Sequence, residues 1–137
     1  MKLMLDANIL LDVLQNRQPH VRASSLIWKI CECGQATGYV SSLSFANLVY
    51  VMRKELDPAS IEDVYRKLSL LFRWADLSQS DLSRAAALRW NDFEDALQAV
   101  MARRLGADYV VTRNLSYYKN SPIPAITPEE LLRIMAE

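Results

Sequence analysis

The sequence predicts a three-layer α/β/α sandwich around a central, mostly parallel β-sheet. Short apolar segments alternate with longer segments of helical periodicity along the chain, and this alternation is typical of a parallel sheet covered by helices. The first segment, residues 2–5, is apolar after Lys2, as expected of a strand buried on both faces. We expect one domain over residues 1–137, because the sequence contains no repeat, linker or low-complexity segment.

In the first half of the chain, strands are expected at 2–5 and 39–41, and helices at 7–15, 20–35 and 44–56. The second of these helices has apolar residues at helical spacing, and Gly34 lies near its end. The third helix carries Phe45, Leu48 and Met52 on one apolar stripe. Asp57 and the proline after it are expected to end that helix.

In the second half, helices are expected at 61–72, from 80 or 81 to 90, and at 92–105, with strands at 108–112 and 124–126 and a possible short strand at 74–77. Ser60 is expected to cap the first of these helices. Asn91 is expected to cap the third, with Glu94 three residues on in a capping-box arrangement. Gly106 suits the end of that helix, and Pro128 suits the first position of a terminal helix.

Composition argues against several classes of protein. The chain has 16 basic and 16 acidic residues, so binding to RNA would require a local site rather than an overall positive charge. Cys31 and Cys33 point to different sides of a helix, which suits a reducing compartment. We expect a cytoplasmic protein, because no leader segment or membrane-spanning run is found. A single histidine, His20, gives little support to Ser-His or Cys-His catalysis, and no glycine-rich phosphate loop is present.

Polar side chains follow two strands of the predicted sheet. They are Asp6 and Asn8 after the first strand, and Thr112, Arg113 and Asn114 after the strand at 108–112. The carboxyl ends of parallel strands form the binding crevice in open α/β sheets. Asp92 and Asp95 lie in the first turn of the late helix, and their spacing of three places both on one face.

The three aspartates have two interpretations. Asp6 can cap the helix that follows it, and Asp92 and Asp95 can stabilise a helix amino terminus through the macrodipole. Spacing alone favours this structural role. Alternatively, the carboxylates converge to hold one Mg²⁺ or Mn²⁺ ion, since hard divalent cations prefer oxygen ligands. Such an ion would lower the pKa of a bound water and offset charge on a phosphodiester. Arg113 would then contact a backbone phosphate, or else form a salt bridge.

Three segments, residues 5–14, 92–98 and 106–114, resemble the PIN-domain family in order and spacing. The similarity extends to residues 126–132, and so covers essentially the whole chain. Within the family, the sequence is similar to the VapC-like ribonuclease toxins of type II toxin–antitoxin pairs. The resemblance implies a parallel sheet flanked by helices and cleavage of RNA that depends on Mg²⁺ or Mn²⁺.

By resemblance, Asp6, Asp92 and Asp95 match the acidic residues that hold the metal and carry catalysis. Asn8 and Thr112 match polar positions that support the site. Asn114 belongs to the Thr-Arg-Asn motif of residues 112–114.

Two positions depart from the family pattern. Asn47 stands where many members carry a glutamate, and Tyr117 stands where many carry an aspartate. Asn47 offers only a neutral oxygen, and a phenol with a pKa near ~10 is rarely ionised at neutral pH. We therefore expect a single ion that binds weakly without RNA.

Three functions follow as hypotheses. The first is a metal-dependent RNA endonuclease, which by resemblance has a small antitoxin protein as partner, forms a homodimer and has no membrane association. The second is a PIN-like module that has lost catalysis and binds RNA or a protein partner without cleaving. The third is a structural subunit whose apolar surface serves association only.

Overall fold

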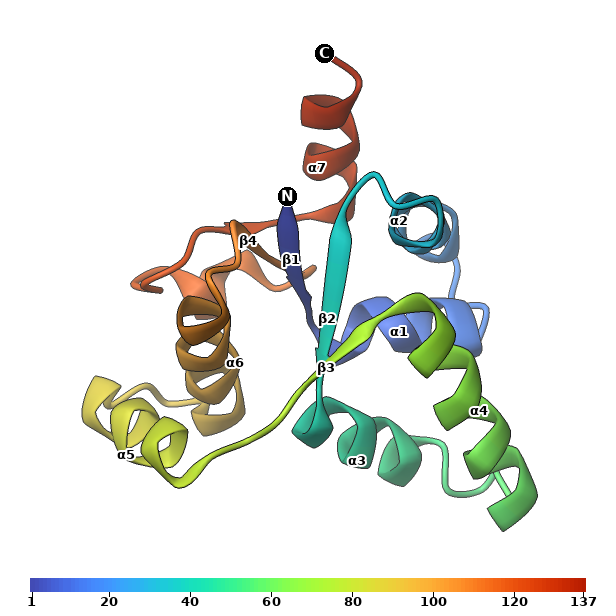
Figure 1. Cartoon of the computed structure of the whole chain (residues 1–137), viewed down its shortest axis with the longest axis horizontal. Helices are drawn as coiled ribbons and strands as arrows, with labels where there is room; N and C mark the ends of the chain where they lie inside the picture. Colours follow the sequence, from blue (N-terminus) through green and yellow to red (C-terminus); the bar gives the residue numbers. More distant parts are fainter.

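Five short parallel strands form the centre of the computed structural model, which describes residues 1–137. The strands are β1 (Lys2–Leu5), β2 (Thr37–Ser41), β3 (Arg73–Ala75), β4 (Tyr109–Val111) and β5 (Ala125–Ile126). Their order across the sheet is β3-β2-β1-β4-β5, and every neighbouring pair is parallel. Strand β1 therefore lies in the middle of the sheet (Figure 1). The predicted parallel sheet is confirmed.

Helices cover both faces of this sheet. They are α1 (Ala7–Leu14), α2 (Val21–Glu32), α3 (Ser42–Val51), α4 (Pro58–Leu71), α5 (Gln79–Leu88), α6 (Phe93–Leu105) and α7 (Pro128–Met135), with a short 3₁₀ helix, η1 (Leu115–Tyr118). Figure 1 shows α5 and α6 on one side of the strands and α1, α2 and α4 on the other. No helix is both long enough and apolar enough to cross a membrane.

The alternation of side chains along β1 explains why both faces need helices. Leu3 and Leu5 are fully buried in the core formed with α1, α2, α3, α4 and α7, whereas Met4 is buried in a second core against α6. Burying one such side chain contributes about 1.5–3 kcal/mol, so an apolar strand of this kind is stable only between two helical layers. The three-layer α/β/α sandwich predicted from the sequence is confirmed.

Two helix caps differ from the expected residues. Helix α4 begins at Pro58 and is capped by Asp57, whose Oδ1 accepts a hydrogen bond from the Ser60 amide at 2.8 Å. Ser60 was the expected cap, but proline suits the first helical position and moves the start of the helix upstream. Helix α6 is capped by Asp92 rather than by the expected Asn91. The Asp92 carboxylate oxygen is an equally good cap acceptor.

Other boundaries also shift. Helix α5 begins at Gln79, before the expected position, because Ser78 and Asp81 form a capping box there. Helix α2 ends at Glu32, before the expected residue 35, since Gly34 adopts a positive φ of 76°. Gly106 is confirmed at the end of α6, with a φ of 71°.

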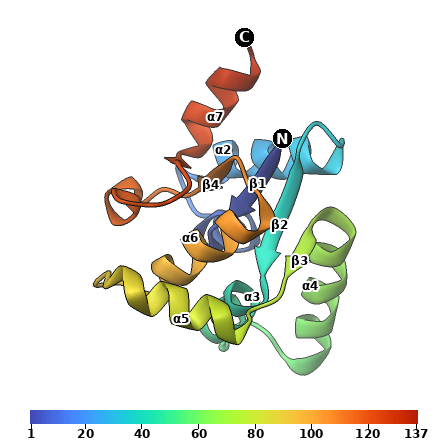
Figure 2. The ribbon, with the colours of Figure 1, turned by 60° about the vertical axis from the view of Figure 1, so that its left-hand side comes forward.

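An ion pair between the buried Asp81 of α5 and the partly exposed Arg104 joins α5 to α6. The Arg104 guanidinium donates to both Asp81 carboxylate oxygens, at 2.9 and 2.8 Å. Although burial acts to raise it, the pKa of Asp81 is lowered by the hydrogen bonds from Arg104 and from Ser78. Figure 2 shows α5 lying beside α6 on the outer side of the sheet. The pair thus fixes the helix that precedes the first turn of α6.

Candidate active site

The site lies at the carboxyl edge of the sheet, where β1 and β4 end side by side. Because Leu5 pairs with Val111, the residues that follow, Asp6 and Thr112, also become neighbours. The Thr112 hydroxyl donates a hydrogen bond to Asp6 Oδ2 at 2.8 Å. The Asn8 amide also donates to Asp6 Oδ2, at 3.4 Å. Thus Asp6, Asn8 and Thr112, which the sequence placed at this edge, come together.

Asp6 does not act as a helix cap. It occupies the position before α1, but its side chain makes no capping hydrogen bond. Its carboxylate instead faces Thr112 and Asn8. The structural interpretation of Asp6 is therefore wrong, whereas the same interpretation is right for Asp92, whose Oδ1 accepts from the Asp95 amide at 3.1 Å.

Asp95 is held by a tyrosine that the sequence analysis missed. The Tyr118 hydroxyl donates a hydrogen bond to Asp95 Oδ1 at 3.1 Å. Tyr118 is buried and packs edge-on against Trp90, with the ring centroids 5.9 Å apart. Nothing in the sequence marks Tyr118, because its partner Asp95 lies 23 residues away.

The Asp6, Asp92 and Asp95 carboxylates lie close enough for their negative charges to repel one another. Burial, followed by the neighbouring Asp6 and Asp92 carboxylates, raises the pKa of Asp95 to about 7. Burial is also the main cause that raises the pKa of Asp6, and Asp92 adds to it. Burial and the same carboxylates raise the pKa of Tyr118, so its hydroxyl stays a donor. A cation at this edge would relieve the repulsion among the acids.

The donor chemistry of this edge suits a hard divalent cation. Asn8 Oδ1 and Gln98 Oε1 are buried without a hydrogen-bond partner, and a buried oxygen without a donor is costly unless something binds it. Gln98 also donates to the Leu5 carbonyl at 3.2 Å. As the structure stands, no group of three or more His, Cys, Asp or Glu side chains is arranged to hold an ion. The side chains present nevertheless all offer oxygen atoms as metal ligands, the kind of ligand that Mg²⁺ prefers.

Gln98 was not singled out from the sequence, although its spacing gave a signal. It lies three residues after Asp95 on α6, and that separation places both side chains on the same helix face. Extending the pair Asp92 and Asp95 by one more step of three would have found it.

Arg113 forms an ion pair with a buried aspartate. Its Nε and Nη2 donate to the two carboxylate oxygens of Asp12, both at 3.0 Å. Ser24 Oγ also donates to Asp12 Oδ2, at 2.8 Å. The salt bridge left open as an alternative for Arg113 is present, and it is largely buried. The Arg113 charge also acts to lower the pKa of Asp6.

The remaining expected residues lie around this centre. The Asn47 side chain of α3 donates to Glu94 Oε2 at 2.9 Å, so the residue that departs from the family pattern contacts the first turn of α6. The backbone amide of Asn114 donates to Thr112 Oγ1 at 3.1 Å and so helps to orient the Thr112 hydroxyl. Tyr117 is exposed on η1.

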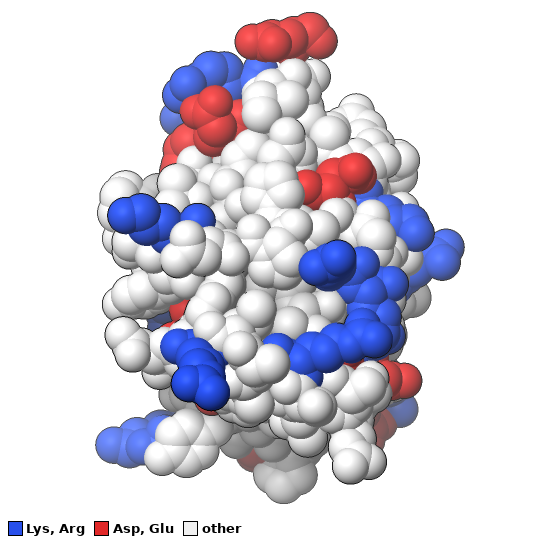
Figure 3. All heavy atoms as spheres, turned by 90° about the vertical axis from the view of Figure 1, so that its left-hand side faces the viewer, with Lys and Arg blue, Asp and Glu red and all other residues white.

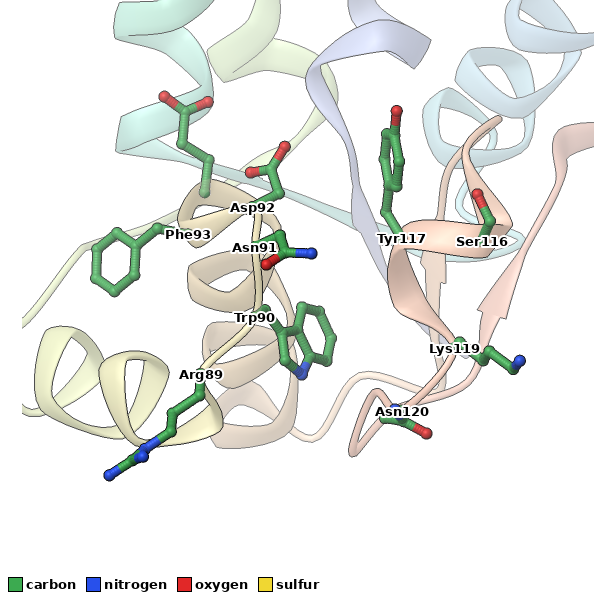
Figure 4. A pocket seen from close by; sticks show the side chains of 10 residues that line it. Arg89, Trp90, Asn91, Asp92, Phe93, Ser116, Tyr117, Lys119 and Asn120 are labelled. Atoms are coloured by element: carbon green, nitrogen blue, oxygen red, sulfur yellow. The ribbon is translucent and has the colours of Figure 1, made fainter.

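An open cleft of about 910 Å³ adjoins the site at Asp92. It lies between the start of α6 and the segment around η1 (Figure 4). Its lining consists of residues 89–94 together with Ser116, Tyr117, Lys119 and Asn120. Asp92 is the one expected metal ligand that lines this cleft.

Comparison with known proteins agrees with the fold. The chain is 23% identical over 133 residues to ribonuclease VapC1 of Aquifex aeolicus (strain VF5), which covers 94% of this chain and 92% of the relative. It superposes on VapBC-1 from nontypeable Haemophilus influenzae with a TM-score of 0.71 and 14% identity, over 94% and 99% of the two chains. A toxin–antitoxin complex from Klebsiella pneumoniae gives a TM-score of 0.70 and 22% identity, over 91% and 96%. The model of the PIN domain family matches residues 2–116, and the chain therefore belongs to that family.

Proposed function

We propose that this chain, as a single PIN domain over residues 1–137, is a metal-dependent RNA endonuclease and the toxin of a toxin–antitoxin pair. The observation that carries the proposal is the pair of carboxylates, Asp6 and Asp95, held at the carboxyl edge of the sheet by Thr112 and Tyr118. Raised pKa values are typical of functional carboxylates. The likeness to ribonuclease VapC1 supports RNA as the substrate.

In this proposal Asp6, Asp92 and Asp95 would hold one Mg²⁺ or Mn²⁺ ion, with the unpaired oxygens of Asn8 and Gln98 beside them. When bound, the ion would supply an activated water and offset charge on the phosphodiester. Without RNA the ion is expected to bind weakly, because Asn47 and Tyr117 add no charge to the three carboxylates.

The other residues position these acids. Thr112 and Tyr118 each fix one carboxylate oxygen, and Asn114 orients Thr112. Asn47 holds Glu94 next to Asp92. Arg113 keeps Nε and Nη2 on Asp12, which leaves Nη1 to contact a backbone phosphate.

Cleavage of a labelled single-stranded RNA in Mn²⁺ tests the site. Asp6→Asn and Asp95→Asn are each expected to lose at least ~100-fold in rate, because each removes a charge on which transition-state stabilisation depends. Asp63→Asn, at an exposed position of α4, is the matched control and should cleave like wild type. Equal rates for wild type and both site variants would refute the assignment.

A second candidate function is a PIN domain that binds RNA or a protein partner without cleaving it. The neutral Asn47 and Tyr117 at positions where many members carry acids favour this reading. Calorimetry with Mn²⁺ separates the two functions. Micromolar binding that Asp6→Asn abolishes would contradict an inactive site, and undetectable binding both with and without RNA would favour the binding module.

We further propose a small antitoxin as partner and a homodimer as the assembly. The antitoxin is supported by the fold shared with toxin–antitoxin complexes, and the homodimer by the family resemblance alone. Exposed apolar side chains also support association, among them Leu70, which is 87% exposed. Sedimentation velocity of the isolated chain tests the homodimer, and a monomer at micromolar concentration would contradict it.

A further inference from the structure

The cleft beside Asp92 has two walls of different origin. One wall is the segment 89–94 that leads into α6, and the other is formed by η1 and the residues after it. In Figure 4 the Trp90 indole lies between the two walls, and Asp92 and Tyr117 project toward the same end. Lys119 and Asn120 lie along the η1 wall. The cleft thus adjoins the acidic site and shares Asp92 with it.

Aromatic rings are available in this cleft. Tyr117 is 58% exposed and takes part in no aromatic pair within the chain, unlike its neighbour Tyr118. Trp90 is partly exposed, and its ring is fixed edge-on against Tyr118. A fixed ring and an exposed ring suit the stacking of a nucleobase, which is worth about 1–3 kcal/mol per base.

The polar side chains that line the cleft suit the phosphates and the base edge of a nucleotide. Lys119 and Arg89 are exposed and form no ion pair within the chain, so both can contact phosphates. Asn91 and Asn120 offer amide donors and acceptors for the edge of a base. Glu94, which also lines the cleft, is bonded to Asn47. The two acids of the cleft, Asp92 and Glu94, lie on the α6 wall together with Arg89, whereas Lys119 lies on the η1 wall.

The surface around α5, α6 and η1 carries a local excess of basic groups. Figure 3 shows Lys and Arg side chains spread across this side of the molecule, with few acids among them. From the start of α5 to the end of α6, and on η1 and directly after it, the exposed basic residues without an ion pair are Arg84, Arg89, Arg103 and Lys119, against the exposed acids Asp92 and Glu94. Although the whole chain is neutral, this face is therefore suited to a polyanion.

We propose that the cleft binds one unpaired base of single-stranded RNA, next to the phosphodiester that enters the acidic site. Tyr117 stacks on the base and Lys119 contacts its phosphate. A base within a duplex is already stacked on its neighbours, so the cleft selects single strands. This inference rests on the proposed function for the role of the neighbouring phosphodiester. It also gives the phenol at position 117 a binding role of its own.

Fluorescence anisotropy of a labelled 12-nucleotide single-stranded RNA tests the proposal, in EDTA so that metal-dependent cleavage does not occur. Tyr117→Ala should weaken binding about 5- to 160-fold, the loss of one stacked base, and Tyr117→Phe should bind like wild type. Tyr50→Ala, which removes an exposed tyrosine of α3, is the matched control and should bind normally. Lys119→Gln should reduce the slope of log Kd against log salt by about 0.7.

The proposal is overturned if Tyr117→Ala binds the RNA as tightly as Tyr50→Ala, if a duplex of the same sequence binds equally well, or if wild type binds no RNA. Its failure is distinguishable from failure of the proposed nuclease. Loss of binding in Tyr117→Ala without any cleavage by wild type in Mn²⁺ would keep the base site and refute the nuclease. Cleavage that depends on Asp6 but has an unchanged KM in Tyr117→Ala would refute the base site alone.

Discussion

The buried ion pair between Arg113 and Asp12 predicts an asymmetric response to mutation. The Asp12 side chain is 0% exposed, whereas that of Arg113 is 24% exposed. Arg113→Met keeps the apolar stem but leaves a buried carboxylate with only the Ser24 hydroxyl as a side-chain donor. Leaving a buried charge unpaired costs about 3–5 kcal/mol, and this is the expected loss for Arg113→Met.

Asp12→Asn should cost less. The Arg113 guanidinium can turn toward water because it is already partly exposed, and the amide oxygen of an asparagine can still accept from Ser24. We expect a loss of about 1–3 kcal/mol, that of a hydrogen bond to a charged group. Since a domain of this kind is stabilised by only about 5–15 kcal/mol, both losses are measurable.

Urea denaturation followed by circular dichroism measures both variants, with the slope m used to check that the unfolding transition is unchanged. Arg133→Met is the matched control, because its pair with Glu130 is exposed and should be worth less than about 1 kcal/mol. The reasoning is refuted if Asp12→Asn is the more destabilised variant, or if Arg113→Met costs no more than Arg133→Met.

Three further predictions concern the acids of the site and the helix beside it. In metal-free protein, the folded state holds a proton on Asp95 up to pH about 7, whereas the unfolded state releases it near ~4. The free energy of unfolding should therefore fall as pH rises from 4 to 7, and Asp95→Asn should flatten that slope in urea titrations. Tyr118→Phe removes the hydrogen bond that lowers the pKa of Asp95, so a carboxyl NMR titration should show that pKa above its wild-type value. Asp81→Ala leaves Arg104 without its partner and should cost about 1–3 kcal/mol, that of hydrogen bonds to a charged group, because the partly exposed Arg104 can turn toward water; hydrogen exchange should show the loss concentrated in α5.

The sequence was sufficient to predict the three layers and the polar residues that follow the strands. The alternation of apolar segments and helical periods determined the sandwich, and a parallel sheet necessarily brings Asp6 and Thr112 to one edge. Cap residues were less certain, because Asn91 and Asp92 are adjacent and both are good caps. Only the backbone geometry at the start of α6 decides between them.

The contacts that hold the site together could not be predicted from the sequence. Asp12 lies 101 residues from Arg113, and Gln98 lies 93 residues from Leu5. No periodicity or spacing rule operates over such separations, because these contacts exist only after the sheet and helices have packed. The same is true of Tyr118, whose contact with Asp95 depends on the position of η1 against α6.

The central position of β1 has a consequence for the order of events during synthesis. Strand β1 is made before the other four strands, yet β4 beside it is only the fourth to be made, and the Thr112 hydroxyl that orients Asp6 lies 106 residues later. At a synthesis rate of roughly 5–20 residues per second, Thr112 is made on the order of 5–20 s after Asp6. A nascent chain therefore carries an unfinished acidic edge throughout that interval, and the ribosome that makes it is not exposed to an assembled site before β4 and η1 have been made.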